Sequence, residues 1–425
     1  MVTKDPASAE GARSEPQASG VAGGPGSARA GTRCFDPYSY EIDEDPYPVY
    51  RWMRDDAPVY RNERLGFFAL TRFDDVLEAF LDWETYSSAE GTVLELMGSE
   101  ISGSMIIFMD PPRQTRYRNL VSKAFTPRRV SALAPQIREI ATGYLDALIG
   151  RARFDVVKEF SAKLPMDVIS ALLGIPAADR DLVRGWSNDM LHRDPGNPMP
   201  PRRALESMGR LLAYFDAALA ERRARPRDDL MTALLAAELP GGDGAPERLT
   251  PVEIRSFINL LAAAGNETVT KLLATACLWL ARNPDERRRL AADPALVPGA
   301  VEETLRYDPP SQYQGRTLTR DVTLHGVAMP KGSRVLLING ATGRDGRRFP
   351  DPDRFDVRRA IDLHLGFGHG RHVCLGASLA RLESRIAQEE LLRRFRDWEV
   401  APDGIERMHS SNVRGFAGLE LEIAG

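Results

Sequence analysis

Residues 365–376 of this 425-residue chain read Leu-Gly-Phe-Gly-His-Gly-Arg-His-Val-Cys-Leu-Gly. Three alternating glycines force an irregular turn whose backbone can come close to a bound group. Cys374 ends this turn, and a helix is expected to begin at Leu375 and to continue through Ala380 and Ile386. Because backbone amides at a helix start stabilise negative charge, we expect Cys374 to be a thiolate.

The loop residues alone allow more than one role for Cys374. It can be a nucleophile with His372 as its base, or it can be the axial ligand of a haem iron. A buried structural cysteine is the third alternative. The glycines do not form a nucleotide-binding fingerprint, because their spacing is not G-x-G-x-x-G and no strand precedes them.

A long helix is predicted between Thr250 and Pro284. Thr250 can cap this helix, Pro251 suits its first position, and Glu253 can bond back to the cap amide. About 33 residues at ~1.5 Å each give roughly 50 Å, which is long enough to cross a domain of this size.

The middle of this helix, Leu260–Thr268, carries small residues followed by an acid and an alcohol. Gly265 weakens the hydrogen-bond ladder and a threonine hydroxyl can bond back to a carbonyl, so we expect a bend here. Glu267 beside Thr268 at a bend can pass protons. The alternative is an ordinary helix crossing with a solvated Glu267.

Most of the remaining sequence has a helical pattern. Apolar residues recur at helical spacing in residues 137–148 and 211–219, whereas strand patterns are brief, at residues 67–71, 322–328 and 333–338. We therefore expect a mainly α protein with a minor β part.

Composition limits the function classes. Residues 1–33 are mainly Gly, Ala, Ser and Pro and predict a disordered tail, which leaves residues 34–425 as one large domain. With 56 basic and 60 acidic residues the net charge is −4, which argues against nucleic-acid binding. Three distant cysteines exclude a disulfide scaffold and favour a reducing cytoplasm. No apolar run of about 18 residues occurs, so no membrane-spanning helix is expected.

The stretch Phe367–Gly376 matches the F-G-x-G-x-H-x-C-x-G signature, and in this the chain resembles the cytochrome P450 monooxygenases, above all the soluble bacterial members. Ala264–Thr268 resembles their oxygen-activation segment, and Glu303–Arg306 their E-x-x-R motif. Pro352–Phe355 resembles the segment whose arginine completes a Glu-Arg-Arg cluster. The resemblance runs from about Asp36 to the C-terminus. It implies the cytochrome P450 fold, a single large helical domain with a small β-sheet region.

The resemblance also implies a haem b cofactor. Cys374 would be its proximal ligand, with Phe367 shielding the sulfur. Gln114 stands where the family often has a histidine and would make a neutral contact. The other residues that the resemblance places at the haem are Gly368 and Ala264 near the porphyrin and Arg118, Arg316 and His372 at the propionates.

The expected activity is hydroxylation or epoxidation with O2. The resemblance implies that Thr268 holds a water at the bound oxygen and that Glu267 feeds protons. Glu303, Arg306 and Arg354 would form a buried structural ion-pair cluster.

The substrate is expected to be a largely hydrophobic small molecule, such as a polyketide-type metabolite, a lipid or a steroid. Electrons would come from a separate ferredoxin and ferredoxin reductase using NAD(P)H, and the protein is expected to be a monomer. A peroxygenase and a non-catalytic haem sensor are the competing hypotheses; a Cys/His hydrolase is a further one. The residues expected to line the substrate pocket are Leu96, Met97, Leu260, Leu261, Tyr313 and Gln314.

Overall fold

The computed structural model describes residues 34–98, 105–191, 201–240, 245–410 and 412–423. Phe35–Gly425 is one compact unit, and the predicted tail at residues 1–33 lies outside the described residues. Among the helices described, none combines the length and apolarity that a membrane span requires.

Helices dominate the described chain, so the mainly α fold class is confirmed. The α-helices are α1 (Tyr40–Glu44), α2 (Tyr47–Asp56), α3 (Phe73–Leu81), α4 (Arg113–Ala124), α5 (Pro127–Ala132), α6 (Ala134–Asp146), α7 (Leu164–Leu173), α8 (Arg180–Leu191), α9 (Arg202–Ala224), α10 (Leu230–Ala236), α11 (Pro251–Arg282), α12 (Pro284–Ala292), α13 (Val297–Tyr307), α14 (Asn339–Thr342) and α15 (Ala377–Arg394). The strands are β1 (Val59–Asn62), β2 (Phe67–Leu70), β3 (Tyr86–Ser87), β4 (Arg153–Asp155), β5 (Glu238–Leu239), β6 (Glu247–Arg248), β7 (Gln314–Leu318), β8 (Val322–Leu324), β9 (Val327–Met329), β10 (Arg334–Leu337), β11 (Trp398–Met408) and β12 (Gly415–Ile423).

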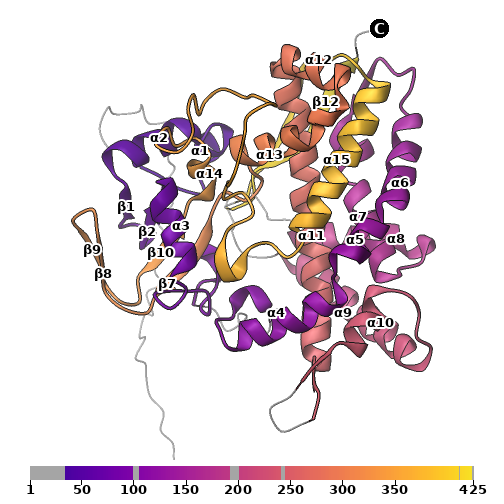
Figure 1. Ribbon diagram of the computed structural model, residues 1–425, viewed down its shortest axis with the longest axis horizontal. Helices are drawn as coiled ribbons and strands as arrows, with labels where there is room; N and C mark the ends of the chain where they lie inside the picture. The colour runs from indigo at the N-terminus through magenta and orange to yellow at the C-terminus, as the bar shows by residue number, and fades with distance from the viewer. Residues whose placement is uncertain (1–33, 99–104, 192–200, 241–244, 411, 424–425) are drawn as a thin grey trace, which may run out of the picture. The chain divides into compact units, whose positions relative to one another are not determined.

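Helix α11 runs through the core beside α15 (Figure 1). The predicted capping box starts it: Thr250 Oγ1 accepts from the Glu253 amide over 3.2 Å, and Glu253 Oε2 accepts from the Thr250 amide over 2.8 Å. The helix continues unbroken through Gly265. A Cβ at Gly265 would lie 2.5 Å from Ile169 Cδ1, so the glycine lets α7 pack closely against α11.

The main sheet has the strand order β1-β2-β10-β7-β3 and lies on the side of the unit away from α6, α7 and α8 (Figure 1). β2 and β10 coincide with two of the predicted strands, and the third predicted strand is the β8–β9 hairpin. In the antiparallel pair β10–β7, Val335 lies opposite Arg316. A second sheet, β11-β12-β4, was not predicted.

Candidate active site

The loop before Cys374 has a path fixed by its own backbone and by α3. The Cys374 amide donates to the Phe367 carbonyl over 2.9 Å. Gly370 has φ +67°, and a Cβ there would lie 2.6 Å from the Phe80 carbonyl oxygen, so only glycine fits. Helix α15 begins at Ala377, slightly later than predicted.

The backbone amides predicted to stabilise a thiolate are in place. Desolvation by the surrounding protein raises the pKa of the Cys374 thiol, although hydrogen bonds from Gly376 and Ala377 and the charges of Arg118 and Arg381 lower it. Cys374 nonetheless remains exposed, so a bound group can reach it. A metal ion bound there would add the positive charge that deprotonates a coordinating thiol.

Three basic side chains from three segments, which we call the cation cluster, gather beside this loop: Arg118, Arg316 and His372. Arg118 of α4 donates to the Val373 carbonyl over 2.7 Å. Arg316 of β7 is buried, with its guanidinium 5.5 Å from the centre of the Phe80 ring.

No ion pair joins the two arginines of the cation cluster to a carboxylate in the described ranges. Among the described residues, Arg316 hydrogen-bonds only the Gly315 carbonyl, and burial lowers its pKa to about 10. Burial and the two arginines lower the pKa of His372 to about 3, and no group in the part of the chain that the structure describes hydrogen-bonds its buried Nε2. The two arginines thus lack an anionic partner, and an anion bound beside them would also raise the pKa of His372, so the cation cluster fits the two propionates of a haem.

Gln114 lies one turn before Arg118 on α4. Its Nε2 donates to the Arg371 carbonyl over 2.8 Å, so the amide holds the cysteine loop from the α4 side. The residue is 1 % exposed, which leaves little of its surface for a direct contact with a bound group.

One face of α11 is open near the cysteine loop. Ala264 is exposed and Thr268 is half-buried, although they lie in the middle of a long core helix. The Thr268 hydroxyl donates to the Ala264 carbonyl over 2.8 Å, as predicted. Phe367 packs against a buried apolar cluster, which consists of Leu272, Val301 and Leu305. Leu272 lies one turn beyond Thr268, so the cysteine loop lies near this part of α11.

Glu267 is paired rather than solvated. Its Oε1 lies 2.7 Å from Nζ of Lys271, one turn later on α11. Lys271 is 3 % exposed and also donates to the Phe416 carbonyl of β12 over 2.6 Å. Gly415 makes room for it, because a Cβ there would lie 2.5 Å from Lys271 Cδ. Lys271 is absent from the predicted site, although a Glu–Lys spacing of four on a helix is a usable signal.

The structural ion-pair cluster consists of Glu303, Arg306 and Arg359. Glu303 and Arg306 are fully buried, with Nε–Oε2 at 2.6 Å, and Arg359 Nε lies 3.3 Å from Glu303 Oε2. The prediction that Arg354 completes this cluster is wrong, because its side chain is 58 % exposed and faces Asp356. A turn closed by the Arg359 amide and the Asp356 carbonyl (3.0 Å) brings Arg359 to Glu303 instead.

Known proteins resemble this chain over most of its length. The family profile described as Cytochrome P450 matches residues 202–419. Cytochrome P450 123 of Mycobacterium tuberculosis is 47% identical over 393 residues, which cover 92% of this chain and 96% of that protein. The chain belongs to the cytochrome P450 family.

Other members of the cytochrome P450 family match over a similar length. The vitamin D(3) 25-hydroxylase of Pseudonocardia autotrophica is 38% identical and covers 92% of this chain and 97% of that protein. The solved structure of cytochrome P450 CYP109Q5 from Chondromyces apiculatus has a TM-score of 0.84 at 36% identity, and covers 92% of this chain and 98% of that one. The P450 fold is thereby confirmed.

Tyr313 does not line the substrate pocket of this cytochrome P450, and that prediction is wrong. Its side chain is 1 % exposed in the core, and its hydroxyl accepts from the Leu94 amide over 3.3 Å. Side chains alternate along β7, so Gln314 and Arg316 share the face opposite Tyr313. The remaining pocket predictions concern half-buried residues: Leu96, Met97, Leu260, Leu261 and Gln314.

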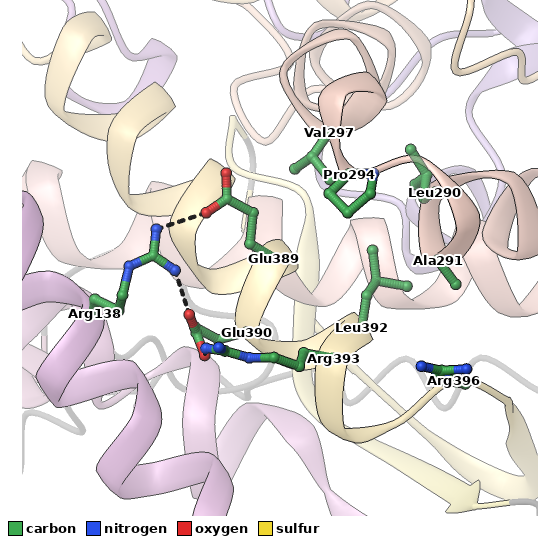
Figure 2. A pocket seen from close by; sticks show the side chains of 10 residues that line it. All are labelled: Arg138, Leu290, Ala291, Pro294, Val297, Glu389, Glu390, Leu392, Arg393 and Arg396. Atoms are coloured by element: carbon green, nitrogen blue, oxygen red, sulfur yellow. Dashed lines mark hydrogen bonds and ion pairs between the residues drawn. The ribbon is translucent and has the colours of Figure 1, made fainter.

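A groove of about 340 Å³ lies at the far end of α15, and Figure 2 shows the side chains that line it. Its lining includes Leu290, Val297 and Leu392, and Arg138 of α6 bridges Glu389 and Glu390 across one side. The groove is lined by the last turns of α15, whereas Cys374 precedes its first turn. At ~1.5 Å per residue the two are roughly 20 Å apart, so the groove is separate from the cysteine site.

Proposed function

We propose that this cytochrome P450 is a haem-thiolate monooxygenase that hydroxylates or epoxidises a largely hydrophobic small molecule. It uses O2 and electrons from a separate ferredoxin and ferredoxin reductase. The observation that carries the proposal is the cation cluster, which has no carboxylate partner in the described chain and lies beside Cys374. When bound, haem supplies the activation of O2, which thiolate ligation favours.

The residues at the cysteine loop would hold the cofactor. Cys374 would bind the iron, and the cation cluster would bind the propionates. Phe367 packs against the cluster that contains Leu272, and Gly368 and Ala264, which have small side chains or none, would leave room for the flat ring. His372 hydrogen-bonds the Met109 backbone, not Cys374, which disfavours its role as the base of a nucleophilic cysteine.

Proton handling is assigned to α11. The Thr268 hydroxyl gives its hydrogen to the Ala264 carbonyl, so its oxygen can accept from a water on the open face. Glu267 lies next to it, with Lys271 holding one carboxylate oxygen. A peroxygenase would not need this acid–alcohol pair, and a haem sensor would need neither the pair nor a pocket.

The substrate class follows from the half-buried apolar residues on α11 and before α4. Leucine and methionine side chains there favour a neutral, apolar ligand, and Gln314 can orient it with one hydrogen bond. One relative is named for hydroxylating vitamin D(3), a compound of this chemical kind. We therefore favour a polyketide-type, lipid or steroid-like substrate.

An acidic ferredoxin would dock on the basic surface around the cysteine loop. Arg113, Lys123, Arg128 and Arg371 are exposed, and no ion pair involves them among the described residues. Arg116 and Arg129, also candidates, pair with acidic residues of this chain. Opposite charge across the contact would speed association.

The first test is the optical spectrum of the purified protein. We expect a ferrous–CO band at the thiolate-shifted position for the natural protein and for Cys34→Ala, and its loss in Cys374→Ala. A thiolate band that survives in Cys374→Ala would contradict the ligand assignment.

The second test is coupling, measured as product formed per NADPH consumed. Thr268→Ala is expected to release most of the reducing equivalents as hydrogen peroxide while keeping its haem, whereas Thr268→Ser keeps the hydroxyl and stays coupled. Unchanged coupling in Thr268→Ala would remove Thr268 from the proton path.

A further inference from the structure

A network of charged and polar side chains connects the cysteine loop to α13 and α15. It has no part in the function described so far. It joins Glu302 of α13, His364 before the loop and Arg381 of α15. Arg381 holds the Glu302 carboxylate with two donors, Nε at 2.7 Å and Nη2 at 2.9 Å. His364 Nε2 lies 2.9 Å from Glu302 Oε2.

The histidine in this network has a defined tautomer. The Gly366 amide donates to His364 Nδ1 over 3.1 Å, so Nδ1 is the acceptor. The ring proton is therefore on Nε2, which donates to Glu302. His364 ties the start of the cysteine loop to α13. Gly366 is seated tightly there, since a Cβ would lie 2.7 Å from the Leu305 carbonyl oxygen.

Two residues of the network contact Phe367. The Arg381 guanidinium lies 4.7 Å from the centre of the Phe367 ring, a cation–π contact, and the His364 ring lies 5.9 Å from it. Phe367 in turn accepts the Cys374 amide hydrogen through its carbonyl. One residue thus connects the network to the cysteine.

Glu302 and Arg381 bring one negative and one positive charge to the network. Burial opposes ionisation of Glu302, but the hydrogen bonds from His364 and Arg381 prevail and lower its pKa to about 2. Arg381 is permanently charged. Removing either residue therefore leaves an unbalanced charge of known sign next to Phe367.

We propose that Glu302, His364 and Arg381 are positioning residues that hold Phe367 against Cys374 and set the one-electron reduction potential of the haem bound there. The inference rests on the proposed function, because it requires haem at Cys374. Ferric haem takes up one electron to become ferrous haem. A nearby positive charge favours the ferrous form and a negative charge the ferric form.

The test is a redox titration of the haem-loaded protein, with dithionite as the electron donor and optical mediators. Arg381→Gln leaves Glu302 unbalanced and is expected to lower the potential, whereas Glu302→Gln leaves Arg381 unbalanced and is expected to raise it. Since the Arg381 side chain is 44 % exposed, solvent screens the charge, and we expect about a threefold change in the ferric-to-ferrous ratio. At 59 mV per tenfold change this is about 28 mV.

The control is Arg385→Gln, one turn further along α15, whose side chain is 42 % exposed and whose charge faces Glu389 instead. Its potential should equal that of the natural protein. Shifts of the same sign in Arg381→Gln and Glu302→Gln, or no shift in either, would overturn the inference. The titration contains no ferredoxin, so changed docking cannot produce a shift.

If a single variant does not retain haem, its potential cannot be titrated. The double variant Glu302→Gln/Arg381→Gln, which removes both charges, then tests the inference. It should keep the thiolate band and titrate at the natural potential, and a double variant displaced as far as a single one would contradict the inference. Failure of the proposed function looks different, because the natural protein would then lack the thiolate band altogether.

Discussion

The ion-pair cluster and the cation cluster differ in the groups that their arginine side chains contact. In the ion-pair cluster, two guanidinium groups face the carboxylate of Glu303, and backbone carbonyls take up their remaining donors. In the cation cluster, the arginines contact only carbonyl oxygens of the described residues, and none of those residues hydrogen-bonds the His372 Nε2. The first arrangement pairs its charges within the described chain, whereas the second leaves room for the anionic ligand that we propose. Charge balance therefore separates a structural cluster from a binding site.

The largest effect is expected from Arg306→Met in the ion-pair cluster. The change leaves the fully buried Glu303 facing Arg359 alone, and breaking such a pair costs about 3–5 kcal/mol. Denaturant unfolding followed by circular dichroism measures the loss. A loss below about 1 kcal/mol would mean that the cluster does not hold the fold together.

A smaller loss of stability should show which arginine, Arg359 or Arg354, is the third member of this cluster. Arg359→Met removes a contact to Glu303 and should cost about 1–3 kcal/mol. Arg354→Met should stay within about 0.5 kcal/mol of the natural protein, because its exposed side chain faces Asp356 and its carbonyl is retained. The same unfolding experiment compares both variants, and the reverse order would restore Arg354 to the cluster.

The cation cluster should respond with the opposite sign. Arg316→Met removes a buried charge without a carboxylate partner, so the haem-free protein should be as stable as the natural one or up to about 1 kcal/mol more stable. Haem should dissociate about tenfold faster, because one charge-assisted contact worth about 1.5 kcal/mol is lost. Haem transfer to apomyoglobin measures this rate. If Arg316→Met instead destabilised the haem-free protein and left the rate of haem dissociation unchanged, the cation cluster would be a structural cluster like the ion-pair cluster.

The smallest effect is expected from Gln114→His, which restores the histidine that the family often has there. Gln114 is almost fully buried and already donates to the Arg371 carbonyl, a bond that an imidazole N–H can replace. We expect the haem dissociation rate to change by less than about threefold, or about 0.6 kcal/mol. A slowing beyond tenfold would show that Gln114 leaves the cation cluster short of one propionate contact.

The sequence predicted those parts of the site that depend on local geometry. The capping box of α11, the glycine turn before Cys374 and the back-bonded Thr268 involve residues within a few positions of each other, so their spacing alone determines the contacts. Helix α11 continues through Gly265 without a break, and a bend of its axis there stays a prediction. The missing side chain at Gly265 makes room for Ile169 of α7, a contact that spacing along the sequence does not reveal.

Contacts that depend on the path of a loop were not predictable in this way. Arg354 and Arg359 stand five positions apart in one loop, and only the intervening turn decides which of them reaches Glu303. The strands β11 and β12 were missed because Pro402, Asp403 and Gly404 interrupt β11 and predict a turn. In the structure this segment is a register shift between Val400 and Ile405 within a continuous strand.

The contact between Gly415 and Lys271 has a consequence for the C-terminal sheet. Residue 415 cannot carry even a methyl group without displacing the lysine stem, and the next carbonyl of β12 holds the lysine head. Lys271 therefore links the β11–β12 hairpin to the carboxylate of Glu267. Under the proposed function, a substitution in this hairpin that displaces Lys271 would also change the setting of the acid assigned to proton delivery.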